Sequence, residues 1–82
     1  MPNDCVTFDN RDYYIEVGLN IAFYRKRAGM TQDNLAEKAG LSRSHLSAIE
    51  APNIIRPFSM EALFNIARAL GVEPCKLLEL RE

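Results

Sequence analysis

The chain has 82 residues, of which 48% are hydrophobic and 26% are charged, and its formal net charge is −1. This composition is typical of one small soluble domain, and a chain this short gains stability when it dimerises. No apolar run approaches the length of a membrane span, and the N-terminus is polar and acidic rather than signal-like. We therefore expect a cytoplasmic protein.

The two cysteines, Cys5 and Cys75, lie far apart, with no second cysteine near either. Zinc sites and redox motifs need closely spaced ligands or thiols, and cytosolic thiols stay reduced. We therefore expect two free thiols, no metal site and no cofactor.

The first predicted elements are a tail and a helix. Residues 1–11 show no periodicity, which indicates a flexible N-terminal tail with at most a short strand at 6–8. Residues 12–82 are predicted to form a single domain. Its first helix runs from about residue 12 to 28, because Val17, Ile21 and Tyr24 recur on one helical face.

The next stretch predicts two short helices joined by a tight turn, over residues 32–39 and 43–50. Thr31 and Ser42 each precede a helical run and can cap it. Gly40 stands where the first of these helices must end in a left-handed conformation. The apolar positions are Leu35, Ala36, Ala39, Leu41, Leu46 and Ile49.

The last third of the chain predicts a connector and two more helices. Residues 51–58 contain two prolines, which forbid a regular helix. Ser59 caps a helix that Gly71 ends, and a short fifth helix carries Pro74 in its first turn, where proline is tolerated. The expected fold is all-α and compact, with five short helices around one small core.

Positive charge gathers in the middle of the chain. Residues 20–58 carry six basic and three acidic side chains, a net of +3, whereas residues 1–19 carry −3 and residues 59–82 carry −1. A basic segment of this kind favours contact with phosphates, although a window of this length can drift by three charges without any function.

The outward positions of the predicted helix at 43–50 suit a DNA groove. Arg43, Ser44, Ser47 and Ala48 are short or polar apart from the arginine, and His45 adds a further hydrogen-bonding group. Such a surface fits a major groove better than a protein core.

These features resemble the helix-turn-helix of lambda-repressor-like regulators, the Cro/repressor or XRE family. The resemblance covers roughly residues 15–80. The central match is Thr31, Gln32, Leu35, Ala36, Ala39, Gly40, Leu41, Ser42, Leu46, Ile49 and Glu50. The flanking match is Gly18, Ile21, Arg25, Gly29, Leu63, Ala67, Leu70, Gly71, Val72 and Leu77.

The resemblance and the residue chemistry together predict a set of DNA contacts. Base-reading candidates are Arg43, Ser44, His45, Ser47 and Ala48, with the forked arginine suited to guanine. Phosphate-binding candidates are Thr31, Gln32, Asn53 and Arg56, since Gln32 begins a helix whose N–H groups attract anions. The resemblance also implies an ion pair between Arg25 and Glu50 that holds the reading helix.

Several apolar residues fall outside the predicted core. Leu19, Phe23, Ile54, Ile55, Leu78 and Leu80 form a candidate dimer interface. A two-fold dimer would place two reading helices about one DNA turn apart. The alternative is that the N-terminal tail folds back over this surface.

The leading functional hypothesis is a sequence-specific transcriptional regulator that binds double-stranded DNA as a homodimer, as a repressor of a palindromic operator. The alternative is an antitoxin-like or regulator-partner module on the same fold, which binds a protein and has weak or no DNA binding. An enzyme is not expected, because the single histidine has no plausible catalytic partners and no metal or phosphate motif is present.

Overall fold

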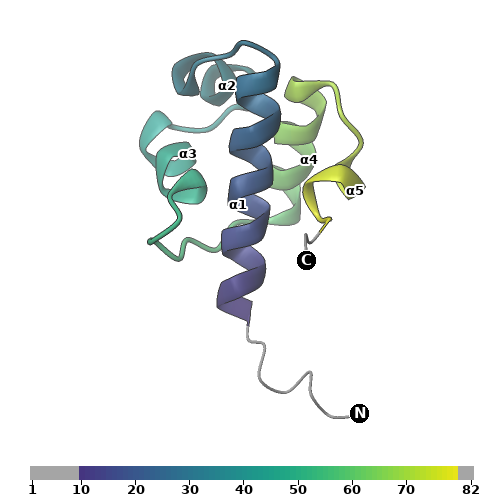
Figure 1. Ribbon diagram of the computed structural model, residues 1–82. Helices are drawn as coiled ribbons and strands as arrows, with labels where there is room; N and C mark the ends of the chain where they lie inside the picture. The colour runs from purple at the N-terminus through teal and green to yellow at the C-terminus, as the bar shows by residue number, and fades with distance from the viewer. Residues whose placement is uncertain (1–9, 80–82) are drawn as a thin grey trace.

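The computed structural model describes residues 10–79 and confirms the predicted all-α fold (Figure 1). Five helices follow in the expected order. They are α1 (Asn10–Arg27), α2 (Gln32–Ala39), α3 (Arg43–Glu50), α4 (Met60–Leu70) and α5 (Pro74–Leu77). Within residues 10–79 no helix has the length and apolar character needed to span a bilayer.

The start of the first helix differs from the prediction. Helix α1 begins at Asn10 rather than at Asp12, so the last two residues assigned to a tail are helical. The acidic side chain of Asp12 lies in the first turn, where its negative charge interacts favourably with the positive end of the helix dipole. The predicted strand at 6–8 lies outside the described residues, and so does Leu80.

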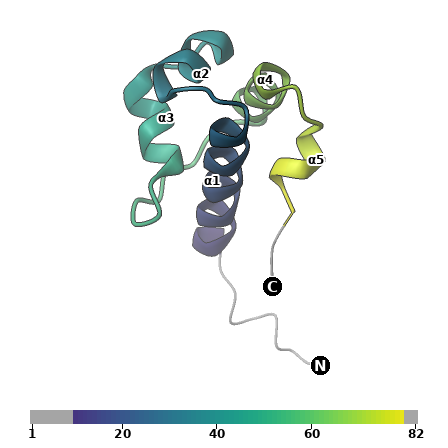
Figure 2. The same cartoon turned by 45° about the horizontal axis from the view of Figure 1, so that its top comes forward.

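Helix α1 is the central element. It packs against α3, α4 and α5, while α2 packs against α3 and α4. Figure 2 shows α2 and α3 on one side of α1 and α4 and α5 on the other. This arrangement leaves the outer face of α3 uncovered by the other described helices, as Figure 1 also shows.

The core is contributed by all five helices. Its fully buried large side chains are Ile21, Leu35, Leu46, Leu63, Ile66 and Leu77. Each such side chain stabilises the fold by about 1.5–3 kcal/mol through burial. Of the predicted core face of α1, Val17 and Ile21 are buried, whereas Tyr24 is only partly buried against the cluster.

The predicted caps around the turn are present. The Thr31 hydroxyl accepts a hydrogen bond from the Asn34 N–H at 3.0 Å, and the Thr31 N–H donates to the Asn34 side chain at 3.3 Å. The Ser42 hydroxyl accepts from the His45 N–H at 3.0 Å. Gly40 between them has φ of +72°, as the predicted left-handed turn requires.

Candidate nucleic-acid interface

The first turn of α3 presents the clearest outward surface. Arg43 and Ser44 are exposed, and 61% of the Arg43 side chain is accessible. Ser47 and Ala48 lie one turn later and are half-buried. One long cationic side chain beside short ones can approach base edges closely.

His45 does not fit the base-reading role that the sequence suggested. Its side chain is half-buried, and its Nε2 atom is shielded from solvent with no hydrogen-bond partner among the described residues. Helix periodicity places position 45 beside the buried side of α3 rather than on the face of Arg43 and Ser47. In this arrangement Nε2 is not offered to a base.

The structure brings Arg25 and Glu50 together in a two-pronged ion pair. Arg25 Nε donates to Glu50 Oε2 at 2.8 Å, and Arg25 Nη2 donates to Glu50 Oε1 at 3.0 Å. Arg25 Nη1 also donates to the Met30 carbonyl at 2.8 Å. The two side chains are only 11% and 5% exposed. The pair therefore joins the C-terminal end of α3 to α1 with a defined geometry.

Gln32 has a role that the sequence did not reveal. Its amide nitrogen donates to Glu50 Oε1 at 2.9 Å, and its amide oxygen accepts from Arg43 Nε at 3.4 Å. Both ends of the side chain predicted to bind a phosphate are thus engaged within the protein. A continuous polar chain results, which runs from Arg25 through Glu50 and Gln32 to Arg43.

Asp33 is a second residue that sequence reasoning missed. Its carboxylate Oδ1 lies 3.8 Å from Arg43 Nε, and 72% of its side chain is exposed. The pair joins the first turn of α2 to the first turn of α3. Neither helical periodicity nor motif spacing signals a contact between positions so far apart in sequence.

Two further residues hold α1 against its neighbours. A Cβ atom at Gly18 would collide with the carbonyl oxygen of Ile49, so glycine permits the close approach of α1 and α3. Asn20 is 2% exposed, and its side-chain nitrogen donates to the carbonyls of Leu77 at 3.0 Å and Glu79 at 2.6 Å. A buried polar group needs such partners, and here they tie down the end of α5.

The remaining phosphate candidates lie in two places. Asn53 and Arg56 are exposed on the connector that leaves the C-terminal end of α3. Thr31 is exposed at the start of α2, where its capping bonds account for its presence.

The predicted dimer surface is divided in the structure. Leu19 and Phe23 are exposed one turn apart on α1, and Ile54 and Ile55 are exposed on the connector. Leu78 is exposed after α5, which lies on the opposite side of α1 from α3 (Figure 1). Tyr13, which the sequence also suggested for this surface, is exposed as well, and Met60 and Phe64 are large exposed apolar side chains that the prediction did not include.

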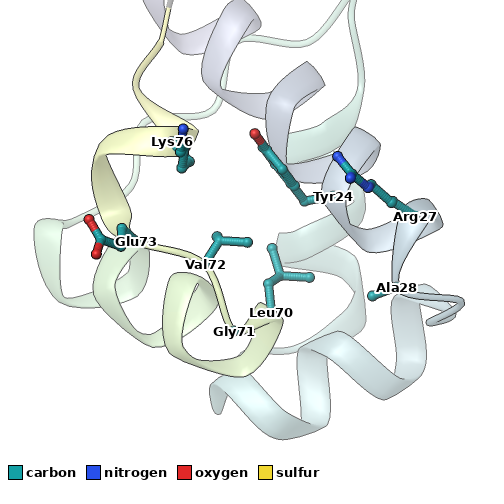
Figure 3. A pocket seen from close by; sticks show the side chains of 8 residues that line it. All are labelled: Tyr24, Arg27, Ala28, Leu70, Gly71, Val72, Glu73 and Lys76. Carbon is teal, nitrogen blue, oxygen red and sulfur yellow. The ribbon is translucent and has the colours of Figure 1, made fainter.

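One hollow lies apart from the surface of α3. It measures about 670 Å³ and lies between the C-terminal end of α1 and the turn from α4 to α5 (Figure 3). Tyr24, Leu70 and Val72 line it together with Arg27 and Lys76. No residue of α2 or α3 contributes to its wall, so it is not part of the candidate interface.

A protein-family model described as "Helix-turn-helix" matches residues 21–77. The HTH-type transcriptional regulator y4dJ of Sinorhizobium fredii is 34% identical over 62 residues, covering 76% of this chain and 78% of that protein. The HTH-type transcriptional regulator SinR of Bacillus subtilis is 38% identical over 63 residues, covering 77% of this chain. The chain spans only 56% of the length of SinR.

Two solved structures share the fold. The restriction-modification controller protein C.AhdI from Aeromonas hydrophila has a TM-score of 0.73 at 30% identity, over 78% of this chain and 94% of that one. The biofilm regulator SinR in complex with DNA has a TM-score of 0.71 at 38% identity, over 77% and 98%. The chain therefore belongs to the helix-turn-helix family of lambda-repressor-like DNA-binding transcriptional regulators.

Proposed function

We propose that the chain represses transcription by occupying a short palindromic operator as a homodimer, with α3 in the major groove. The observation that carries this proposal is the contrast between the two ends of α3. Arg43 and Ser44 face outward, while Glu50 at the other end is fixed to α1 by a buried ion pair. A rigidly held helix with an exposed first turn suits direct reading of bases.

Arg43 is the main base-reading residue in this proposal. Its guanidinium can donate two hydrogen bonds to guanine O6 and N7, worth about 1–3 kcal/mol of discrimination against another base. Ser44, Ser47 and Ala48 are small enough to let the helix approach and to contact other base edges. His45 is left out, because its Nε2 is shielded from solvent.

Phosphate contacts would fix the position of α3 in the groove. The backbone N–H groups at the start of α2, around Gln32, are the first candidates, because helix N-termini attract anions. Asn53 and Arg56 on the exposed connector are the second. This assignment agrees with the net positive charge of residues 20–58.

A dimer would match the two-fold symmetry of a palindromic site and double the number of DNA contacts. The exposed apolar side chains of Leu19 and Phe23 on α1, of Ile54 and Ile55 on the connector, and of Leu78 after α5 are the candidates for its interface. Repression would follow from occupancy alone, with no chemical step, in the cytoplasm where bacterial DNA lies.

The test begins with selection of a preferred duplex from a random-sequence library. Binding to this duplex and to a scrambled one is then measured by fluorescence anisotropy at two salt concentrations. We expect specific binding that weakens steeply with salt, and Arg43→Ala should lower affinity for the selected duplex about tenfold. Arg68→Ala is the matched control, since Arg68 is an exposed arginine on α4 that bonds Asn65.

Failure of the wild-type protein to bind either duplex at low salt would overturn the proposal. The protein-interaction module would then be the better explanation, because an apolar protein interface is far less sensitive to salt.

A further inference from the structure

We infer that Asp33 is a specificity-determining residue, which restrains Arg43 and so weakens binding to DNA of the wrong sequence. The inference rests on the proposed function and concerns the same surface. It starts from one contact, the 3.8 Å approach of Asp33 Oδ1 to Arg43 Nε. A carboxylate beside the principal base-reading cation needs a physical reason, because it opposes DNA binding.

Arg43 is engaged through its Nε atom. The contacts with Asp33 and with the Gln32 amide oxygen, at 3.8 Å and 3.4 Å, both use Nε. In both contacts the nearest Arg43 atom is Nε rather than a terminal amino group, and the two terminal amino groups supply the remaining donors of the guanidinium fork. Arg43 can therefore be held in orientation at Nε while its terminal donors point to a base.

The orientation of the Arg43 side chain is fixed through Gln32. Gln32 presents its oxygen to Arg43 because its nitrogen is committed to Glu50, which is itself bonded to Arg25. This chain of bonds ends on side chains that are 11% and 5% exposed. The contact between Asp33 and Arg43 is exposed to solvent. Gln32, which also bonds Arg43, is anchored in the protein through Glu50.

The Asp33 carboxylate would also act on the phosphates of the DNA backbone. Asp33 lies in the first turn of α2, beside the N–H groups that are the first phosphate candidates. Its carboxylate weakens their attraction for a phosphate without abolishing it, and at the same place it attracts Arg43. On a random duplex, Arg43 gains only a phosphate contact and loses Asp33. On the preferred duplex it keeps the contact at Nε while its terminal amino groups donate to guanine, so the contact with Asp33 is not lost.

The test compares Asp33→Asn with Glu61→Gln. Glu61 is also an exposed acidic residue in the first turn of a helix, but it belongs to α4. We expect Asp33→Asn to tighten binding to the scrambled duplex about fivefold and to change binding to the selected duplex much less. Glu61→Gln should change the ratio of the two affinities by less than about twofold. Circular dichroism checks that both variants are folded.

A second comparison asks whether Asp33 acts through Arg43. In an Arg43→Ala background, Asp33→Asn should no longer alter the ratio of the two affinities. Persistence of the effect in that background would overturn the inference, since it would then reflect net charge alone. Equal tightening of both duplexes by Asp33→Asn would overturn it as well.

A measurement without DNA separates this inference from the proposed function. The Arg43 Hε resonance in NMR spectra should shift in Asp33→Asn and stay in place in Glu61→Gln, and an unchanged resonance in both would contradict the contact. If the wild-type protein binds neither duplex, the proposed function fails and the inference fails with it. If it binds the selected duplex and the ratio is unaltered, the inference alone fails.

Discussion

The units α2–Gly40–α3 and α4–Gly71–α5 are built on the same turn. Gly40 has φ and ψ of +72° and 30°, and Gly71 has +73° and 28°. In each unit the residue after the glycine donates its N–H to a carbonyl of the preceding helix. Leu41 donates to Ala36 at 2.9 Å, and Val72 donates to Ala67 at 3.0 Å. The first halves of the two units are therefore equivalent.

The second halves differ. Helix α3 has eight residues and a side-chain cap from Ser42, whereas α5 has four residues and Glu73 gives it no side-chain cap. The end of α3 is held by the Glu50 ion pair, and the end of α5 by the Asn20 amide. The comparison teaches that the glycine turn alone does not set the length of the helix that follows it. Both far ends are anchored, but only the longer helix, α3, also has a side-chain cap.

The largest expected effect comes from removing the anchor of α3. Glu50→Gln leaves the Arg25 guanidinium buried without its counter-charge, which should lower the free energy of unfolding by about 3–5 kcal/mol. Urea denaturation followed by circular dichroism measures this. The double variant Arg25→Met with Glu50→Leu should recover most of the loss, because it leaves no buried charge. A loss below about 1 kcal/mol for Glu50→Gln would contradict the anchoring role.

Gly18→Ala should separate α1 from α3. The added methyl group meets the Ile49 carbonyl, and such overpacking costs about 2 kcal/mol. Because α3 must shift, affinity for the selected duplex should also fall by more than the loss of stability explains. Thermal unfolding and anisotropy measure the two effects. Lys26→Ala, at an exposed site on the same helix, should change stability by less than about 0.5 kcal/mol.

Asn20→Ala tests the corresponding anchor of α5. The carbonyls of Leu77 and Glu79 lose their hydrogen-bond donor, which should cost about 1.5 kcal/mol of stability. Affinity for DNA should stay within about twofold when the protein is folded, since α3 is untouched. A loss of affinity comparable to that of Gly18→Ala would show that the two halves are not independent.

The smallest effects compare the two turns directly. Gly40→Ala and Gly71→Ala each force a side chain into the left-handed region, at a cost of about 1 kcal/mol. Their losses of stability should agree, because the two glycines have nearly the same conformation. Only Gly40→Ala should also weaken DNA binding, since its turn positions α3. Chemical denaturation measures the two losses of stability, and fluorescence anisotropy measures the DNA affinity of both variants.

The local features of the fold were predictable from sequence. Thr31, Ser42 and Ser59 are caps and Gly40 and Gly71 are stops, and each acts within one helical turn of its own position. Local signals of this kind need no knowledge of the tertiary structure. The Arg25–Glu50 pair was expected only from the family resemblance, because 25 residues separate its members.

The features that were missed depend on which helices meet. Gly18 stood out only as one position of the family resemblance and Asn20 not at all, and the approach of α3 and α5 gives them their roles. The contacts of Arg43 with Gln32 and Asp33 depend on how α2 and α3 meet, and the shielding of His45 Nε2 likewise depends on the tertiary structure. Residue spacing carries no information on such crossings.

The polar chain that ends at Arg43 has a consequence for how such a protein can acquire a new target. The bonds of Gln32 and Arg25 to Glu50 do not involve position 43, so they survive its replacement. Residue 43 thus lies at the end of the polar chain, and the other bonds of the chain do not depend on it. A library that varies it, together with Ser44 and Ser47, retains the support of α3. Under the proposed function, such a library is the place to search for variants with an altered operator preference.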